Sequence, residues 1–218
     1  MPRLLFEKTG NAVWISHLDL MRLFQRAFKR AGLPLTHTQG FNPRPSVSIA
    51  MPLSVGVESL CEFLDFDLDG EAVPCEDICR LLNENLVEGV RVLKVYDGGM
   101  KIKHIAYLDC TVTLEYDGGT PDGAIETISA LLHSAEVIVP KKGKNGIVDQ
   151  DIIPMIRRVE VTGDISTVTL RALVCCQNPT LNPVQLSAAI EKYLPDCKPD
   201  FTKCCRLEIY DENETVFR

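Results

Sequence analysis

The chain lacks a hydrophobic run long enough to cross a membrane, the common nucleotide-binding motifs and any excess of positive charge. No stretch of about 18 apolar residues occurs in its 218 residues, so no membrane span is expected. The patterns G-x-G-x-x-G, G-x-x-x-x-G-K-[ST], H-E-x-x-H and G-x-S-x-G are also absent, and nothing favours a nucleotide cofactor. The formal net charge of −7 argues against a general nucleic-acid coat protein.

The cysteines favour a reducing compartment. There are nine of them, an odd number, and two charged residues interrupt the apolar run of Met1–Gly10, which argues against an export signal. We therefore expect a cytoplasmic protein without disulfides.

The cysteine spacing does not predict a metal site. A single C-x3-C, Cys75 to Cys79, has no third cysteine at cluster spacing, and no cysteine–histidine pair has zinc spacing. The vicinal pairs 175–176 and 204–205 each place one thiol on either side of an extended strand. Small buried hydrophobes are the favoured interpretation, and zinc or redox chemistry is the alternative.

The order of apolar patterns predicts an α+β fold of two tandem ferredoxin-like (βαββαβ) units with antiparallel sheets. In the first unit, residues 1–97, the expected strands are 3–8, 35–38 continued by 46–50, 62–68 and 90–96, and the expected helices are 16–31 and 75–86. In the second unit, residues 98–218, the expected strands are 106–116, 136–139, 152–161, 167–175 and 201–210, and the expected helices are 123–133 and 183–193. Residues 211–218 are predicted to be a frayed acidic tail.

Charge is unevenly distributed along the chain. Residues 1–50 carry a net charge of +5, residues 51–100 carry −8, and the remainder carries −4. Four basic side chains of the first helix lie opposite its apolar stripe, namely Arg22, Arg26, Lys29 and Arg30. They form either a local basic surface for a polyanion or an ordinary solvated helix face.

The segment Thr36–Pro45 (THTQGFNPRP) is the strongest candidate for a binding loop. Two prolines flank Arg44 and stiffen the backbone around it. Such a loop can present Arg44 to a phosphate, Phe41 for stacking, and Gln39 or Asn42 to base edges. The alternative is a wide structural loop that joins two strands.

Histidine offers weak catalytic candidates. His17 lies in the first turn of the first helix and, beside a phosphate, can act as a general acid or base. Asp19 is two positions away and does not share its helix face, so the candidate partner is His37. A structural or ligand-contacting role is the favoured alternative for both. His104 and His133 are interpreted as incidental.

A second basic segment, 141–146, is predicted to be a loop that contains Lys141, Lys142 and Lys144. Its glycines allow it to close over a polyanion, and a solvated hairpin loop is the alternative.

Several segments together resemble the radical-SAM-linked domain of unknown function. They are 4–10 (LLFEKTG), 16–21 (SHLDLM), 26–32 (RAFKRAG), 38–45 (TQGFNPRP), 52–58 (PLSVGVE), 141–144 (KKGK) and 151–154 (DIIP). Members of that family occur alone or fused behind a radical S-adenosylmethionine (SAM) enzyme, beside genes for ribonuclease G and large-subunit ribosomal proteins. The resemblance therefore implies an accessory role in RNA or ribosome modification.

The resemblance implies a companion rather than the catalyst, because the C-x3-C-x2-C of the radical enzyme is absent. The favoured function is a non-catalytic RNA-binding or substrate-presenting module whose partners are a radical SAM enzyme and an RNA, with tRNA and rRNA as candidates. One alternative is a metal-independent RNA endonuclease that uses His17 and His37, a role suggested by the similarity of a double ferredoxin-like arrangement to CRISPR-RNA-processing endonucleases. The other alternative is a protein–protein adaptor without RNA affinity, docking on the enzyme through its acidic residues 58–97 or through an exposed sheet.

Overall fold

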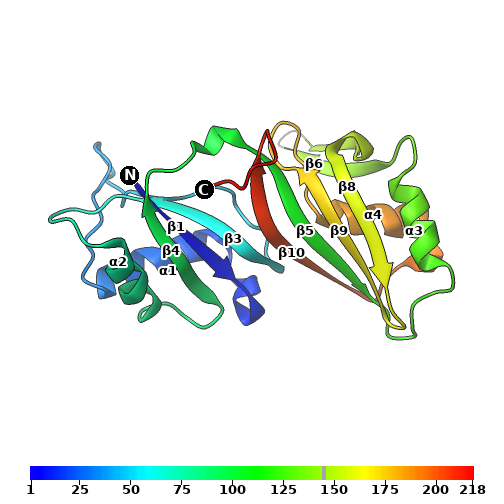
Figure 1. The fold of residues 1–218 in the computed structure, drawn as a ribbon, viewed down its shortest axis with the longest axis horizontal. Helices are drawn as coiled ribbons and strands as arrows, with labels where there is room; N and C mark the ends of the chain where they lie inside the picture. The colour runs from blue at the N-terminus through cyan, green and yellow to red at the C-terminus, as the bar shows by residue number, and fades with distance from the viewer. Residues whose placement is uncertain (144–145) are drawn as a thin grey trace. The chain divides into compact units, whose positions relative to one another are not determined.

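The structure is a computed structural model that describes residues 1–143 and 146–218. It divides into two compact units, which we call unit 1 (Met1–Ile102 with Arg218) and unit 2 (Lys103–Phe217). Both units contain antiparallel strands, and the described residues form four α-helices in all (Figure 1). The fold is thus mixed α and β with antiparallel pairing, as the sequence predicts at this level.

Unit 1 has the element order strand, helix, strand, strand, helix, strand. Its elements are β1 (Pro2–Lys8), α1 (His17–Arg30), β2 (Val47–Ile49), β3 (Val57–Phe66), α2 (Cys75–Asn83) and β4 (Val90–Asp97), with a short 3-10 helix η1 (Gly10–Trp14) before α1. The strands lie in the order β4-β1-β3-β2, and every neighbouring pair is antiparallel. β3 begins five residues earlier than the predicted strand 62–68.

Helix α1 forms where its local signals predict. The side chain of Ser16 caps it by accepting a hydrogen bond from the Asp19 backbone N–H at 3.2 Å. Gly32, with φ of +71°, turns the chain just beyond its last turn. The buried stripe of α1 is Leu20, Phe24, Ala27 and Phe28, which leaves the basic side exposed.

The core of unit 1 lies between its two helices and one face of its sheet. Phe24 of α1 packs edge-on against Phe6 of β1, with ring centroids 4.8 Å apart. Ile78 and Leu82 of α2 belong to the same buried cluster. Figure 1 shows α1 behind β1 and β4. One face of α1 is therefore fixed by packing, and the opposite face is exposed.

Unit 2 repeats this order and adds a hairpin. Its elements are β5 (Ile105–Glu115), α3 (Ala124–Leu132), β6 (Ile138–Gly143), β7 (Gly146–Asp151), β8 (Ile156–Gly163), β9 (Thr167–Cys175), α4 (Val184–Tyr193) and β10 (Phe201–Asp211), with short 3-10 helices η3 (Ile153–Met155) and η4 (Pro195–Cys197). A further 3-10 helix, η2 (Ile102–His104), precedes β5. The strands of the unit 2 sheet lie in the order β10-β5-β9-β8, while β6 and β7 pair only with each other.

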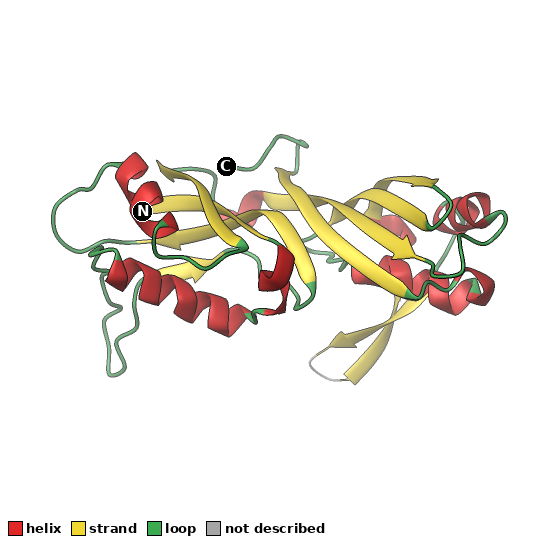
Figure 2. Cartoon of the chain, turned by 90° about the horizontal axis from the view of Figure 1, so that it is seen from below, coloured by secondary structure: helices red, strands yellow, loops and turns green. Residues whose placement is uncertain are grey.

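The predicted loop over 141–146 is wrong at Lys141 and Lys142, which belong to strand β6 of a hairpin. They pair with Val148 and Ile147 of β7 in an antiparallel ladder. This two-stranded ribbon stands apart from the main sheet, as Figure 2 shows, so it does not produce the apolar alternation of a half-buried strand. Lys144 lies outside the described residues.

The predicted frayed tail is also wrong. Phe217 is fully buried, and a β-bridge joins Val216 to Tyr210 of β10. The acidic composition of residues 211–218 suggested a solvated tail, whereas one buried aromatic ring and the backbone pairing hold the segment on unit 2. This error matters for function, because the segment carries Glu214.

Among the residues that the structure describes, no helix is long and apolar enough to cross a membrane.

Candidate nucleic-acid interface

A groove in unit 1 lies between the C-terminal half of α1 and the segment that follows it. Its volume is about 550 Å³. The buried side chains of Phe28, Leu33 and Leu35 line it, together with two prolines, while Lys29 and His37 are exposed lining residues. The groove is thus apolar inside and polar at its margin.

The chain forms this groove because α1 ends in a tight turn. Beyond Gly32, the N–H of Leu33 donates to the carbonyl of Phe28 at 3.0 Å, which folds the chain back on the last turn of the helix. Leu35 then forms a bridge with Leu68, just beyond the end of β3. The segment is therefore held between the helix and the end of the sheet.

The predicted binding loop continues from the groove as a narrow two-armed projection. The N–H of Ser46 donates to the carbonyl of Thr36 at 2.8 Å, and the N–H of Thr38 donates to the carbonyl of Arg44 at 2.8 Å. The N–H of Arg44 also donates to the Thr38 hydroxyl at 3.0 Å. Figure 2 shows the loop extending past α1, away from the strands.

The tip of the loop, residues 39–43, carries Gln39, Phe41 and Asn42 into solvent. The side chain of Phe41 is 99% exposed. A fully exposed phenylalanine gains nothing from the core of its own unit, so its position is unusual for a purely structural loop.

Asp67 anchors the base of the loop to the end of β3. Its carbonyl accepts from the N–H of Thr36 at 3.0 Å, and its carboxylate accepts from the Thr36 hydroxyl at 3.1 Å. Its own N–H donates to the carbonyl of Ser46 at 3.1 Å. Both arms are therefore tied to the sheet.

The predicted basic residues fall into two groups. Arg22 forms an exposed ion pair with Asp19 at 3.0 Å, and Arg30 donates to the carbonyl of Asn85 at 2.5 Å. The hydrogen bond from Ser16, followed by that from Arg22, lowers the pKa of Asp19. These two arginines already have partners in the fold.

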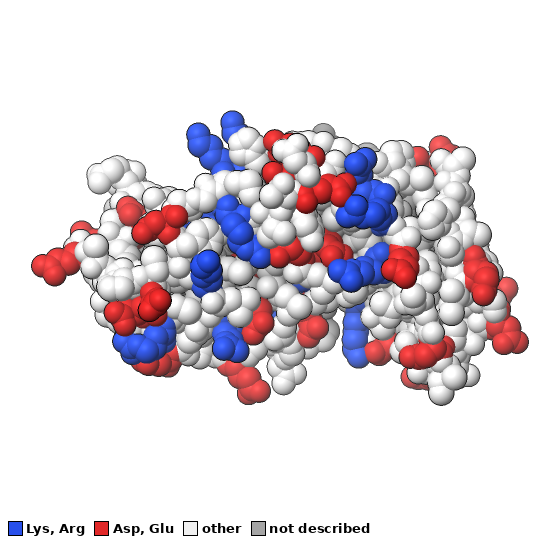
Figure 3. Space-filling model, in the orientation of Figure 1, with Lys and Arg blue, Asp and Glu red and all other residues white. Residues whose placement is uncertain are grey.

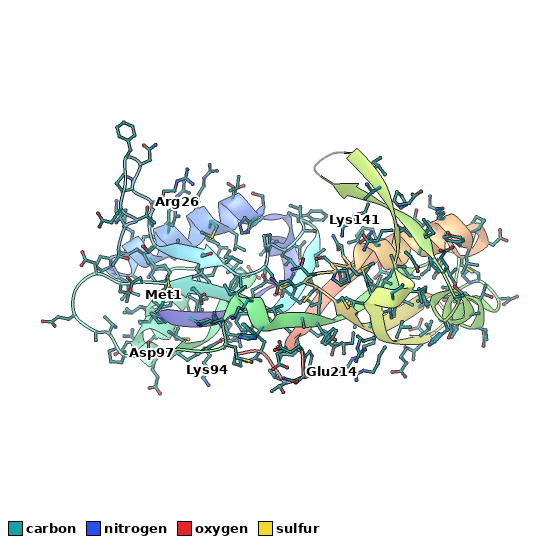
Figure 4. The ribbon with its side chains drawn as sticks, turned by 90° about the horizontal axis from the view of Figure 1, so that it is seen from above. Met1, Arg26, Lys94, Asp97, Lys141 and Glu214 are labelled. Carbon is teal, nitrogen blue, oxygen red and sulfur yellow. The ribbon has the colours of Figure 1, made fainter. Side chains whose placement is uncertain are left out.

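Arg26, Lys29 and Arg44 form the second group, which we call the unpaired cations. Within the described parts of the chain, none of the three side chains forms a salt bridge or a hydrogen bond. Figure 4 shows Arg26 projecting from α1 on the side toward which the loop extends. Lys29 lines the groove, and Arg44 lies in the loop that borders it. Pairing within the fold thus leaves three cations available: Lys29 in the groove, Arg26 on the same helix and Arg44 beside the lining residue Pro45.

The two candidate histidines do not come together. His17 is the first residue of α1, whereas His37 lines the groove beside Lys29. Twelve residues of helix separate His17 from Lys29, a distance of roughly 18 Å along the axis. The geometry does not support an acid–base pair of His17 and His37 in one ribonuclease site.

A family model described as "Uncharacterized protein conserved in bacteria (DUF2344)" matches residues 2–183. The chain belongs to this bacterial family. The description states no activity and does not mention a radical SAM enzyme, so that part of the resemblance stays a prediction.

No curated protein matches the chain. A solved structure described as "Crystal Structure of an Unknown Protein from Galdieria sulphuraria" is 10% identical, over 94% of this chain and 96% of that one, with a TM-score of 0.27. A likeness of this degree supports no conclusion about fold or function.

The sequence analysis did not select a second cavity, which lies in unit 2 and has a volume of about 680 Å³. Arg157, Arg158 and Arg171 line it, and each has a carboxylate partner. Arg158 lies 2.8 Å and Arg157 lies 3.4 Å from Glu214, while Arg171 lies 3.0 Å from Asp109. Figure 3 shows basic and acidic side chains side by side over these strands. The sequence signal that could have indicated this cavity is the set of three arginines in β8 and β9.

Of the remaining basic residues and histidines, Lys141, His104 and His133 have partners within unit 2. Lys141, labelled in Figure 4, donates to the carbonyl of Thr180 at 2.9 Å. His104 lies 3.4 Å from Glu212, and His133 Nδ1 lies 2.8 Å from the carbonyl of Ser129.

The cysteines behave as packed hydrophobic side chains. One member of each vicinal pair is buried, Cys176 in one and Cys204 in the other, as the strand alternation predicts. Burial raises the pKa of Cys176 to about 12 and that of Cys204 to about 11, so both thiols stay protonated at neutral pH. In the described chain, no cluster of three histidine, cysteine or acidic side chains is arranged to hold a metal ion.

Proposed function

We propose that the protein is a non-catalytic RNA-binding module and that it holds a single-stranded segment of RNA along the groove and loop of unit 1. The observation that carries the proposal is the set of unpaired cations on the helix and loop that border an apolar groove, Arg26, Lys29 and Arg44, together with the fully exposed Phe41 of that loop.

The chemistry of this surface suits a polyanion that carries flat rings. Arginine and lysine bind phosphate oxygens by charge-assisted hydrogen bonds, and cations without a carboxylate partner can do so without breaking an ion pair. An exposed aromatic ring stacks on any unstacked base. RNA supplies both groups at regular intervals, and its single-stranded regions expose them together.

We further propose that the module works in the cytoplasm beside a radical SAM enzyme that modifies the bound RNA. Support for this partner comes from the sequence resemblance. Co-purification from native lysate tests it separately from RNA binding.

We also propose that both units are ferredoxin-like. Numbering the sheet strands of each unit along the chain, and setting the β6–β7 hairpin aside, both sheets have the order 4-1-3-2 and both units have the element order βαββαβ. The RNA surface then lies on the first helix and the connection that follows it.

The decisive experiment removes the unpaired cations and compares them with an equal number of paired ones. The variant Arg26→Ala/Lys29→Ala/Arg44→Ala is titrated with a fluorescent single-stranded RNA over a range of salt concentrations. We expect affinity at low salt to fall about tenfold or more and the salt slope to decrease by about 2, because each phosphate contact contributes roughly 0.7 to the slope on a single strand.

The matched control also removes three positive charges, but from ion-paired arginines. It is Arg22→Ala/Arg80→Ala/Arg171→Ala, whose side chains pair with Asp19, with Asp77 and Glu84, and with Asp109. We expect at most a twofold loss of affinity, as a rough limit. Equal losses in the two variants would contradict the proposed site, and no binding by the unaltered chain would favour the adaptor alternative.

A further inference from the structure

The groove has more apolar surface than phosphate binding alone requires. The almost fully buried side chains of Phe28, Leu33 and Leu35 form its floor, and the apolar surface open to a ligand comes chiefly from Pro34 and Pro45. A phosphate held against such a surface would lose its water without gaining hydrogen-bond donors. A flat, largely apolar group suits the interior, and charge suits only the margin.

The size of the groove also suits one ring system with part of its sugar. About 550 Å³ falls within the range of small-molecule sites, which is roughly 300–1,000 Å³. A nucleobase that leaves its stack needs an apolar surface for its faces and polar groups for its edge. The groove offers both.

The polar edge of the groove carries one amide. Gln25 lines the groove one helical turn before Lys29, and in the described structure its side chain forms no hydrogen bond. A glutamine amide presents one donor and one acceptor side by side. That pair complements the Hoogsteen edge of adenine, where N6–H donates and N7 accepts, and on that edge adenine alone offers both groups.

We infer that the groove holds one unstacked adenine, with Gln25 at its edge and Lys29 at the adjoining phosphate. The inference rests on the proposed function, since it assigns a base to the same RNA site. It goes further by assigning sequence preference to a side chain that carries no charge.

The test compares fluorescent oligo(A) and oligo(U) of equal length on the full chain. We expect the unaltered protein to bind oligo(A) about tenfold more tightly, the scale of discrimination that one bidentate amide contact provides. In Gln25→Leu, we expect the preference to fall to about twofold or less while the salt slope stays unchanged, because no phosphate contact is lost. Gln177→Leu, an exposed glutamine of unit 2, is the matched control and keeps the full preference.

A second variant distinguishes a lost contact from a damaged helix. Gln25→Glu keeps the shape of the side chain but only accepts hydrogen bonds, so it repels adenine N7 and favours cytosine N4–H. Oligo(C) should therefore gain on oligo(A) in this variant, while circular dichroism shows the same helix content.

The outcomes separate the two proposals. Equal binding of oligo(A) and oligo(U) by the unaltered chain, with a salt slope that the triple cation variant reduces, overturns the adenine site and leaves the RNA module standing. A preference that survives in Gln25→Leu also overturns the adenine site. Binding of neither oligonucleotide overturns both proposals.

Discussion

Unit 1 and unit 2 share an element order, but the three arginines at the unit 2 cavity are all ion-paired, whereas unit 1 leaves some of its arginines without an ion pair. In unit 2, Arg157 and Arg158 face Glu214, and Arg171 faces Asp109 across neighbouring strands. In unit 1, Arg26 and Arg44 face no carboxylate at ion-pair distance within the described residues. The unit 2 cavity is the larger of the two, yet its positive charge is neutralised within the unit.

This contrast shows that a count of basic residues does not locate an anion site. A carboxylate already beside an arginine must be displaced or repelled by an incoming phosphate, which lowers the gain from binding. The useful quantity is the number of cations that the fold leaves without a partner around one surface.

At high pH, the free energies of unfolding of the two units should differ, and this is the prediction with the greatest magnitude. Burial raises the pKa of Cys110, Cys176 and Cys204 in unit 2, the last two to about 12 and about 11 from an ordinary value of 9.0. Because the folded values are raised, this stability is complete below pH 9 and is lost as the pH rises through 11 to 12. The loss should be on the order of several kcal/mol by the upper end.

Burial also raises the pKa of Cys79 and Tyr96 in unit 1, but this unit contains a buried group that acts in the opposite sense. Burial lowers the pKa of Lys8, so its loss of a proton at high pH favours the folded state. Trp14, the single tryptophan, lies in unit 1 and reports its unfolding alone, whereas circular dichroism reports both units. Urea titrations at pH 11 should show an early dichroism transition that Cys176→Ala/Cys204→Ala shifts toward the pH 8 midpoint. Coincident transitions at both pH values would contradict this difference.

The second prediction compares the contributions to RNA affinity of one exposed aromatic residue in each unit. Phe41→Ala should weaken RNA binding roughly 5- to 150-fold, the range of one base–aromatic stack, without changing the salt slope. Thermal stability should stay the same, because the ring is 99% exposed. Phe201→Ala, a half-exposed ring on β10 of unit 2, is the control and should leave affinity unchanged. A fall in both affinities would assign stacking to both units.

The third prediction, with the lowest magnitude, makes unit 2 resemble unit 1 by removing the carboxylate partner of two of its arginines. Glu214→Gln removes the carboxylate that Arg157 and Arg158 share, which should raise RNA affinity about threefold and the salt slope by about 1. Glu88→Gln makes the same change in net charge at an exposed position without an ion pair in the described structure. An equal gain in both variants would show that net charge, rather than pairing, controls affinity.

The sequence predicted what depends on neighbours along the chain. Ser16 and the apolar spacing of Leu20, Phe24 and Phe28 define α1, because a cap and a helical stripe are complete within a few turns. The exposed position of Phe41 follows in the same way from a turn rich in glycine and proline.

The sequence did not predict what depends on distant partners. Arg30 meets a backbone carbonyl 55 positions away, and Arg158 meets a glutamate 56 positions away. No local pattern separates these arginines from Arg26, so paired and unpaired cations look alike before folding. The β6–β7 ribbon was missed for a different reason. Its two strands pair only with each other, outside the main sheet, so they lack the apolar alternation of a half-buried strand.

One feature of the topology joins the two projecting segments. The loop at 36–46 and the β6–β7 hairpin both occupy the connection between the first helix and the second sheet strand of their units. Each extension starts and ends at the margin of a sheet, so neither interrupts the layer of helix and strands beneath it. The length and chemistry of such a connection can therefore change while the helices and the sheet strands stay the same, and two units with one element order can carry different projecting segments.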